Sequence, residues 1–231
     1  MPADTVLLLP GMMCDERLWQ PQIAALAQRT VVPDTTRDDN FAAMAARILA
    51  SAPPQFALAG LSMGGILAFE LWRQAPERIT HMALLDTNPH PEQPARRALR
   101  VDEIAAVLAG GLREMAIESM KPAYLAAANR DDEALLTRIL DMALELGADV
   151  FERQSVALRD RPDSVPTLAT IGCPVHIICG LEDTLCPVAY HETMANHIAD
   201  ARLSVLANCG HLSTLEQPDA VNDLLTALFA R

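Results

Sequence analysis

Short apolar runs alternate with segments of helical periodicity along much of the chain, and this alternation most limits how it can fold. It is typical of a parallel sheet whose strands are joined by helices packed on both faces. The apolar runs predict six strands, over residues 5–9, 30–32, 55–60, 79–86, 175–179 and 202–207. Helices are expected over residues 19–28, 41–51, 65–74, 187–199 and 218–230. The predicted fold class is therefore α/β, with a mostly parallel sheet of about six strands.

The alternation stops between residues 90 and 165, where the chain has the pattern of consecutive helices. These helices are expected over roughly 94–109, 112–128, 131–146 and 149–159, with a kink at Pro122. A helical insertion into an α/β sheet most simply forms a cap over the edge where ligands bind. We therefore expect an α/β core made of residues 1–89 and 166–231, with a helical cap made of residues 90–165.

Composition limits the partners and the compartment. Hydrophobic residues make up 51% of the chain, enough for a sizeable core, and the net charge of −12 argues against nucleic acid as a partner. No segment approaches the roughly 18 apolar residues of a membrane-spanning helix, and the start lacks a basic signal-peptide region. The five cysteines form no Cys-x-x-Cys pair, which favours free thiols over a zinc site. We expect a cytoplasmic protein, monomer or homodimer, that binds neither nucleic acid nor membranes.

A serine is flanked by glycines at the junction of a predicted strand and a predicted helix. The segment Gly60-Leu61-Ser62-Met63-Gly64 fits the G-x-S-x-G pattern in the strand–turn–helix context that gives this pattern its meaning. A serine at such a turn has a strained backbone, so the residues two before and two after it must be small. Its hydroxyl would project above the sheet, and the Met63 N–H would point toward an oxyanion formed there. Ser62 is thus the candidate nucleophile, and a plain small-residue turn is the alternative.

A serine hydroxyl needs a base, and the base needs a carboxylate to hold it. Of the six histidines, only His211 lies on a loop directly after a predicted strand, at the sheet edge where Ser62 is expected. The carboxylate should follow another strand, and Asp183 is the favoured candidate because it lies at the apex of such a loop. Asp86 and Glu182 remain alternatives.

The loop Leu9-Pro10-Gly11-Met12-Met13-Cys14 follows the first predicted strand and should pass close to the serine. Gly11 would allow this approach, and the backbone N–H of Met12 is the candidate second oxyanion donor. An ordinary strand-to-helix turn is the alternative. The side chains of Met12, Met13 and Met63 either line an apolar acyl pocket or belong to the core.

Several motifs together resemble a known family. LLLPGMMCDERLW, ALAGLSMGGILAFE, APERI, LLDT, CGLEDTLCP and CGHLSTLEQPDAV are similar, in this order, to motifs of the α/β-hydrolase superfamily. They are most similar to small-capped carboxylesterases that resemble pimeloyl-carrier-protein methyl ester carboxylesterase. The resemblance implies a carboxylic-ester hydrolase with Ser62, Asp183 and His211 as its triad and with no metal or organic cofactor.

The chain departs from this family in two places. Pro10-Gly11 stands where the family usually has His-Gly before the oxyanion donor. The chain also starts directly at the strand before this loop, so the family's first hairpin is expected to be absent, with residues 202–207 at one sheet edge. Ester, thioester and lactone hydrolysis all fit the motifs. A same-fold lyase or C–C bond hydrolase, and a ligand-binding protein with slow turnover, are the alternatives.

The sequence leaves the substrate open, beyond a small molecule that is free or linked to a carrier. Tyr124 and Lys121 of the cap either reach into the pocket or lie on the surface. Arg96, Arg97 and Arg100 form a basic cluster at the start of the cap. They either meet an acidic substrate or a phosphopantetheine carrier, or they form a solvated helix face.

Overall fold

The computed structural model describes residues 4–120 and 124–231, and within them it forms a six-stranded sheet of order β2-β1-β3-β4-β5-β6. All neighbouring strands are parallel. The strands are β1 (Thr5–Leu9), β2 (Arg29–Val31), β3 (Phe56–Leu61), β4 (Ile79–Leu85), β5 (Val175–Gly180) and β6 (Ala201–Leu206). The predicted α/β class is confirmed, every strand limit lies within one residue of its prediction, and β6 lies at an edge as expected.

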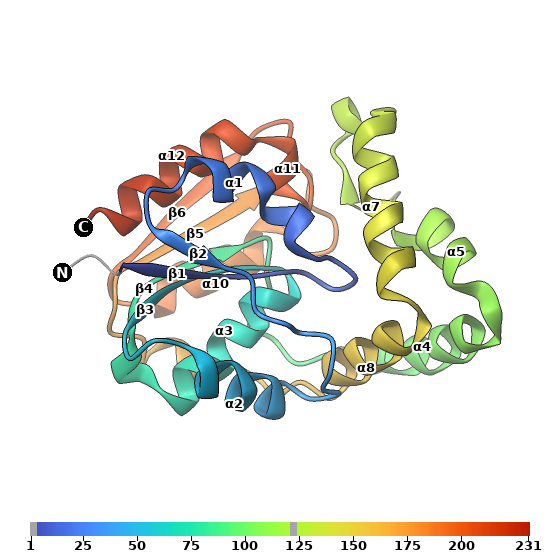
Figure 1. Cartoon of the computed structure of the whole chain (residues 1–231), viewed down its shortest axis with the longest axis horizontal. Helices are drawn as coiled ribbons and strands as arrows, with labels where there is room; N and C mark the ends of the chain where they lie inside the picture. The colour runs from blue at the N-terminus through green and yellow to red at the C-terminus, as the bar shows by residue number, and fades with distance from the viewer. Residues whose placement is uncertain (1–3, 121–123) are drawn as a thin grey trace.

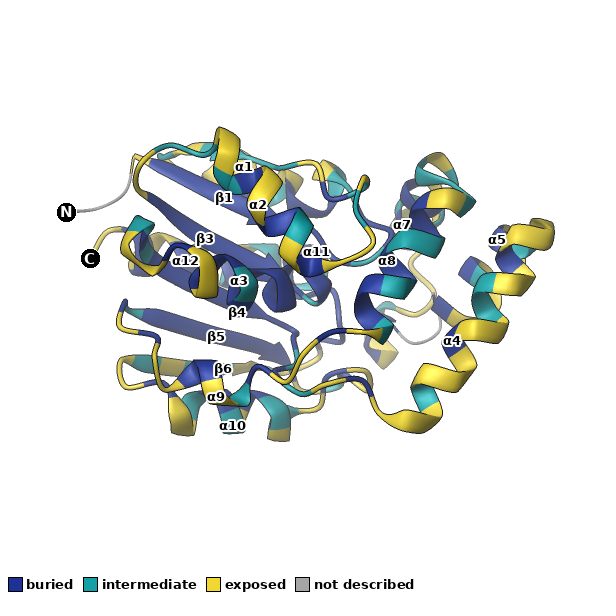
Figure 2. Ribbon diagram, turned by 90° about the horizontal axis from the view of Figure 1, so that it is seen from below, coloured by how far each residue is buried: buried dark blue, intermediate teal, exposed yellow. Residues whose placement is uncertain are grey.

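Successive residues of the central strands pack on opposite faces of the sheet. In β1, Val6 and Leu8 belong to one buried cluster and Leu7 and Leu9 to the other. A strand covered on both faces has no solvent side, so its sequence is a continuous apolar run. Figure 2 shows the central strands buried along their length.

Helices cover both faces of the sheet (Figure 1). α1 (Gln20–Ala25) and α12 (Pro218–Phe229) lie on one face, and α2 (Phe41–Ser51), α3 (Met63–Gln74) and α10 (Val188–His197) on the other. α12 begins at Pro218 and buries Val221, Leu225 and Leu228, which lie on one stripe of the helix. α3 is buried nearly all round, because it is enclosed between the sheet and α2. None of the described helices has the length and apolar character needed to cross a membrane.

A group of helices joins β4 to β5 and lies beyond one end of the sheet (Figures 1 and 2). It comprises α4 (Pro94–Ala106), η3 (Val107–Gly111), α5 (Leu112–Met115), η4 (Ala116–Met120), η5 (Ala127–Asn129), α7 (Glu133–Leu146) and α8 (Ala148–Arg159). The continuous helix predicted over 112–128 is wrong. Gly110, with φ of 105°, lies before this range, between the helices predicted over 94–109 and 112–128. Within the range, a π-helical segment follows α5, Leu125 and Ala126 are not helical, and a 3₁₀ segment begins at Ala127. Pro122, the predicted kink, lies outside the described residues, and the division into core and cap stays a prediction.

Candidate active site

Ser62 lies at the junction of β3 and α3 with φ of 55° and ψ of −115°. This is a strained backbone for a residue with a side chain. The residues two before and two after Ser62 must be glycine, because a Cβ would not fit at either position. A Cβ on Gly60 would lie 2.4 Å from the carbonyl oxygen of Gly64, and one on Gly64 would lie 2.1 Å from that of Leu9. The turn is therefore built as the G-x-S-x-G pattern predicts.

Thr87, two residues after the end of β4, supports this turn from the other side. Thr87 Oγ1 donates a hydrogen bond to the carbonyl oxygen of Ser62 at 2.7 Å. A Cβ on Gly65 would lie 2.5 Å from the same Oγ1, so Gly65 allows Thr87 to reach the turn. The N–H of Thr87 donates to Nε2 of His191 at 3.0 Å. Burial lowers the pKa of His191 to about 4, so its ring is neutral and can accept this bond.

The structure brings together the three residues that the sequence proposes as a triad. His211 Nε2 lies 2.9 Å from Ser62 Oγ, and His211 Nδ1 lies 2.7 Å from Asp183 Oδ2. His211 and Asp183 are both buried. The other oxygen of Asp183 accepts the N–H groups of Leu185 at 2.8 Å and Cys186 at 2.9 Å, which fixes the carboxylate. The arrangement allows a proton to pass from the serine to the imidazole.

The electrostatics of His211 favour its charged form. Burial alone would lower the pKa of the imidazole, but the carboxylates of Asp183, Asp86 and Glu216 outweigh burial and raise it above 6.5. An imidazolium formed when Ser62 loses its proton is therefore stabilised where it forms.

Neither alternative carboxylate is hydrogen-bonded to the imidazole of His211. Asp86 is fully buried and accepts the N–H groups of Gly180 at 2.9 Å and Ser213 at 3.1 Å. Burial and the neighbouring Asp183 raise its pKa. Glu182 instead accepts the N–H of Ala127 at 2.9 Å. Asp86 thus connects the loops of Asp183 and His211 without taking the place of either.

Two backbone N–H groups are available beside Ser62. Met63 is the first residue of α3, and Gly11 lies against the turn, because its Cβ would be 3.6 Å from Ser62 Cβ. The N–H of Met13 is already used, since it donates to Oε1 of Gln154 at 2.8 Å. Within the described part of the chain, the N–H groups of Met12 and Met63 donate to no protein acceptor. Their assignment as the two donors of an oxyanion hole therefore stays a prediction that these free N–H groups allow.

The three methionines proposed for the pocket lie in different places. Met12 lines the cavity above Ser62. Met13, a predicted pocket residue, is only 1% exposed and belongs to the core. The chain turns there with φ of 55°, and the side chain joins the cluster that α1 and α12 cover. The side chain of Met63 is also buried in the core, so this residue offers the site only its backbone.

A cavity of about 310 Å³ opens above Ser62 and His211. The helices between β4 and β5 supply much of its lining, including Arg96, Arg100, Glu103, Met115, Ser119, Met120, Tyr124, Phe151 and Leu158. The ring of Tyr124 lies 5.7 Å from that of His211, as expected of a pocket residue. Lys121, the other cap candidate, lies outside the described residues. Arg97 does not line the cavity, so the predicted basic cluster is divided between the cavity and the surface.

Sequence reasoning missed Glu216, which holds the histidine loop. One oxygen of Glu216 accepts the N–H groups of Gly210 at 2.9 Å and Leu212 at 3.3 Å, on either side of His211. The other oxygen accepts the N–H of Ala126 at 2.8 Å. The only signal in the sequence is an acidic residue five positions after the histidine.

Gly210, which precedes His211, is not the residue at which this loop adopts a positive φ. The left-handed residue of this loop is Asn208, with φ of 51°. A Cβ on Gly210 would instead lie 2.6 Å from the Ala126 nitrogen and 2.7 Å from the Tyr124 oxygen. That oxygen accepts the N–H of His211 at 2.8 Å. Gly210 therefore lets the histidine loop approach the segment that begins at Tyr124.

In the described ranges, one group of side chains has the composition of a metal site. Ligand atoms of Asp183, Cys186 and His211 lie within 4.8 Å of one another. The carboxylate and the imidazole already bond each other, and the second ring nitrogen of His211 lies 2.9 Å from Ser62 Oγ. Both side chains are therefore already used in the contacts of a proton-transfer site.

Comparison with known proteins agrees with this geometry. The model of the Alpha/beta hydrolase family matches residues 6–224, and the chain belongs to this family. It is a hydrolase of the α/β fold. The protein named "Putative carbamate hydrolase RutD" from Escherichia coli O1:K1 / APEC is 26% identical to this chain over an alignment of 243 residues. The alignment covers 96% of this chain and 90% of that protein.

Two solved structures are similar over nearly the whole chain. A thermophilic esterase from Thermogutta terrifontis, with malate bound, has a TM-score of 0.89 and 27% identity, covering 96% of this chain and 88% of that one. A hydrolase from Pseudomonas aeruginosa PA01 has a TM-score of 0.87 and 25% identity, covering 98% and 90%.

Proposed function

We propose that this protein hydrolyses carboxylic esters through an acyl-enzyme on Ser62. One observation carries the proposal. Ser62, His211 and Asp183 form a continuous chain of contacts of 2.9 Å and 2.7 Å at the floor of a cavity. The esterase from Thermogutta terrifontis supports the ester as the substrate class. Thioesters and lactones would be cleaved by the same groups.

The reaction would run in two halves. Ser62 Oγ attacks the ester carbonyl carbon while His211 Nε2 takes its proton, and the N–H groups of Met63 and Met12 hold the oxyanion. The bond to the alcohol breaks, and His211 returns the proton to the leaving oxygen. Water then attacks the acyl-enzyme, His211 takes a proton from it, and the acid leaves as Ser62 Oγ regains that proton. Asp183 stabilises the imidazolium in both halves.

A carbamate is the second candidate substrate class, because several curated relatives carry the name of a carbamate hydrolase. A carbamate carbonyl can be attacked in the same way. A lyase or C–C bond hydrolase of the same fold would use Ser62 and His211 for proton transfer only. Trapping an acyl group on Ser62 would exclude both of these alternative functions.

Labelling with a fluorophosphonate is the direct test. We expect mass spectrometry to find the phosphonyl group on Ser62, and Ser62→Ala to lose both the label and ester hydrolysis, by roughly 10⁴-fold or more. Ser51→Ala is a suitable control, because Ser51 Oγ only donates to the carbonyl oxygen of Ile48 on α2. A label on another residue, or unchanged hydrolysis in Ser62→Ala, would contradict the mechanism. Esters and carbamates of graded size, assayed in parallel, would define the substrate class.

Activity should rise with pH through the pKa of His211. The protonated imidazole cannot accept the proton of Ser62, so kcat/KM is low below this pKa and reaches a plateau above it. Since the carboxylates of Asp183, Asp86 and Glu216 raise the pKa, the midpoint should lie above 6.5. A pH profile of kcat/KM with a neutral ester measures it. A midpoint below 6.5 would contradict the stabilised imidazolium.

A further inference from the structure

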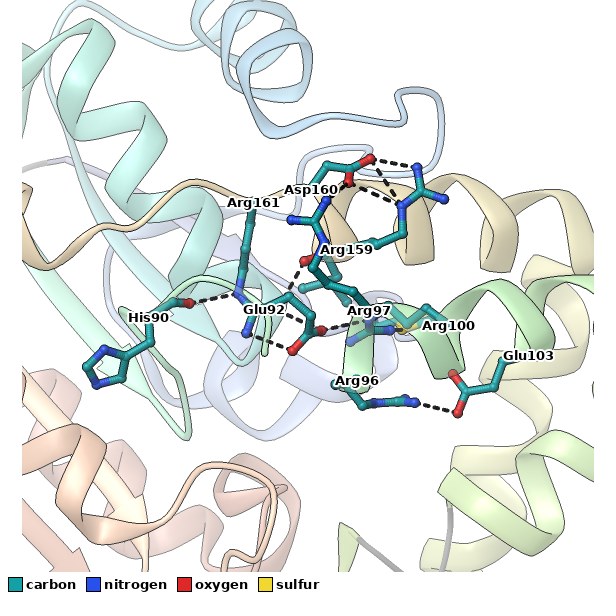
Figure 3. A network of polar contacts seen from close by, with 11 residues as sticks. His90, Glu92, Arg96, Arg97, Arg100, Glu103, Arg159, Asp160 and Arg161 are labelled. Atoms are coloured by element: carbon teal, nitrogen blue, oxygen red, sulfur yellow. Dashed lines mark hydrogen bonds and ion pairs between the residues drawn. The ribbon is translucent and has the colours of Figure 1, made fainter. Parts of the chain in front are cut away.

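The wall of the cavity contains a buried ion-pair network in which two arginines share one glutamate (Figure 3). Glu92 Oε2 accepts Nε of Arg100 at 2.7 Å and Nη1 of Arg161 at 3.0 Å. The side chains of all three residues are at most 10% exposed. A second pair, Arg96 with Glu103 at 2.6 Å, lines the same cavity.

This network leaves the cavity with more positive than negative charge. Three arginines and two glutamates line it, although the chain as a whole has a net charge of −12. A buried guanidinium is costly unless an anion compensates it. Glu92 can compensate only one of its two partners, so the cavity keeps a cation that a bound anion would neutralise.

Arg100 is the arginine of this network whose N–H groups are not all used by acceptors among the described residues of the protein. Arg161 is engaged by the carbonyl oxygens of His90 and Leu158 and by both oxygens of Glu92. Arg100 gives its Nε to Glu92, while its Nη1 meets only the sulfur of Met12 at 3.9 Å, a weak acceptor. In the described ranges its Nη2 has no hydrogen-bond partner. Most of the fork of Arg100 is therefore available to a ligand.

The position of Arg100 places this cation close to the reaction. Met12, whose sulfur its Nη1 contacts, is the residue whose N–H is the candidate second oxyanion donor. Arg100, Met12, Ser62 and His211 line one cavity. A guanidinium binds a carboxylate through two parallel hydrogen bonds, which fixes direction as well as charge. We propose that Arg100 binds a carboxylate on the substrate, so that the esters cleaved here are anionic, such as monoesters of dicarboxylic acids.

This proposal rests on ester hydrolysis at Ser62, and a binding experiment separates the two. Calorimetric titration of the Ser62→Ala protein would compare monomethyl glutarate with dimethyl glutarate. We expect the anionic ester to bind roughly 10- to 100-fold more tightly, as one charge-assisted contact allows. A second arm places the carboxylate on the alcohol, in butyryloxyacetate compared with methyl butyryloxyacetate. Preference for the anion in either arm supports the proposal and shows which side of the ester Arg100 meets.

Arg100→Met in the Ser62→Ala background should remove most of this preference, while Glu92 keeps Arg161 as its partner. Arg100→Lys, which keeps the charge but loses the fork, should retain part of it. Arg97→Met is the matched control, because Arg97 lies on the same helix, pairs with Asp160 and does not line the cavity. Equal binding of anionic and neutral esters in both arms would overturn the proposal, even if Ser62 is the nucleophile. Selective binding without any hydrolysis by the intact protein would overturn the proposed function alone.

Discussion

Replacing Asp183 with asparagine is expected to lower kcat/KM for ester hydrolysis by about 10⁴-fold without unfolding the protein. Asp183 Oδ1 accepts two backbone N–H groups, from Leu185 and Cys186, so the amide oxygen of asparagine would take this place. The amide NH₂ would then face His211 Nδ1 and make it an acceptor. The proton of the neutral imidazole would move to Nε2, which could no longer accept the proton of Ser62.

The measurement is kcat/KM of Asp183→Asn, with circular dichroism to establish that the protein is folded. Glu182→Gln is the matched control, because Glu182 is the adjacent acid and contacts Ala127 instead of the imidazole. We expect this control to stay within a few-fold of the unmodified protein. A large loss in Glu182→Gln together with a small one in Asp183→Asn would assign the carboxylate to Glu182.

Asp183 and the alternative acid Asp86 show how far the sequence could identify the site. Position on a loop after a strand singled out Ser62, His211 and Asp183, because parallel strands end at one edge of a sheet. It could not exclude Asp86, which also follows a strand. What separates Asp86 from Asp183 is the direction of the side chain. Asp86 turns with φ of 45° toward the N–H groups of Gly180 and Ser213, and this direction depends on the tertiary structure.

The core was predictable because its strands are buried on both faces and its helices have clear apolar stripes. Two classes of feature were not. The helix predicted over 112–128 is interrupted by π-helical and 3₁₀ segments that local propensity does not indicate. Contacts between distant residues, such as Gln154 with Met13, also leave no pattern of spacing. The arginine cluster shows the same limit, since burial of Arg100 and exposure of Arg97 depend on which acids lie nearby.

Gly64→Ala should destabilise the protein by about 3 kcal/mol or more, the upper range for forcing atoms into a packed core. The new Cβ would lie 2.1 Å from the carbonyl oxygen of Leu9 and 2.6 Å from its carbonyl carbon. These are backbone atoms of β1, which pairs with strands on both sides and cannot move away alone. The start of α3 would have to shift instead, and Ser62 precedes it directly.

Urea unfolding followed by the fluorescence of Trp19 and Trp72, both buried, would measure this loss. Gly172→Ala is the matched control, because its Cβ would meet nothing within 4 Å, and it should change the free energy of unfolding by less than about 1 kcal/mol. Gly11→Ala should also be mild, since its Cβ would lie 3.4 Å from a side-chain atom of Leu61, an ordinary contact. If Gly64→Ala were as stable as these two, close packing of α3 on β1 could not be what fixes the position of Ser62.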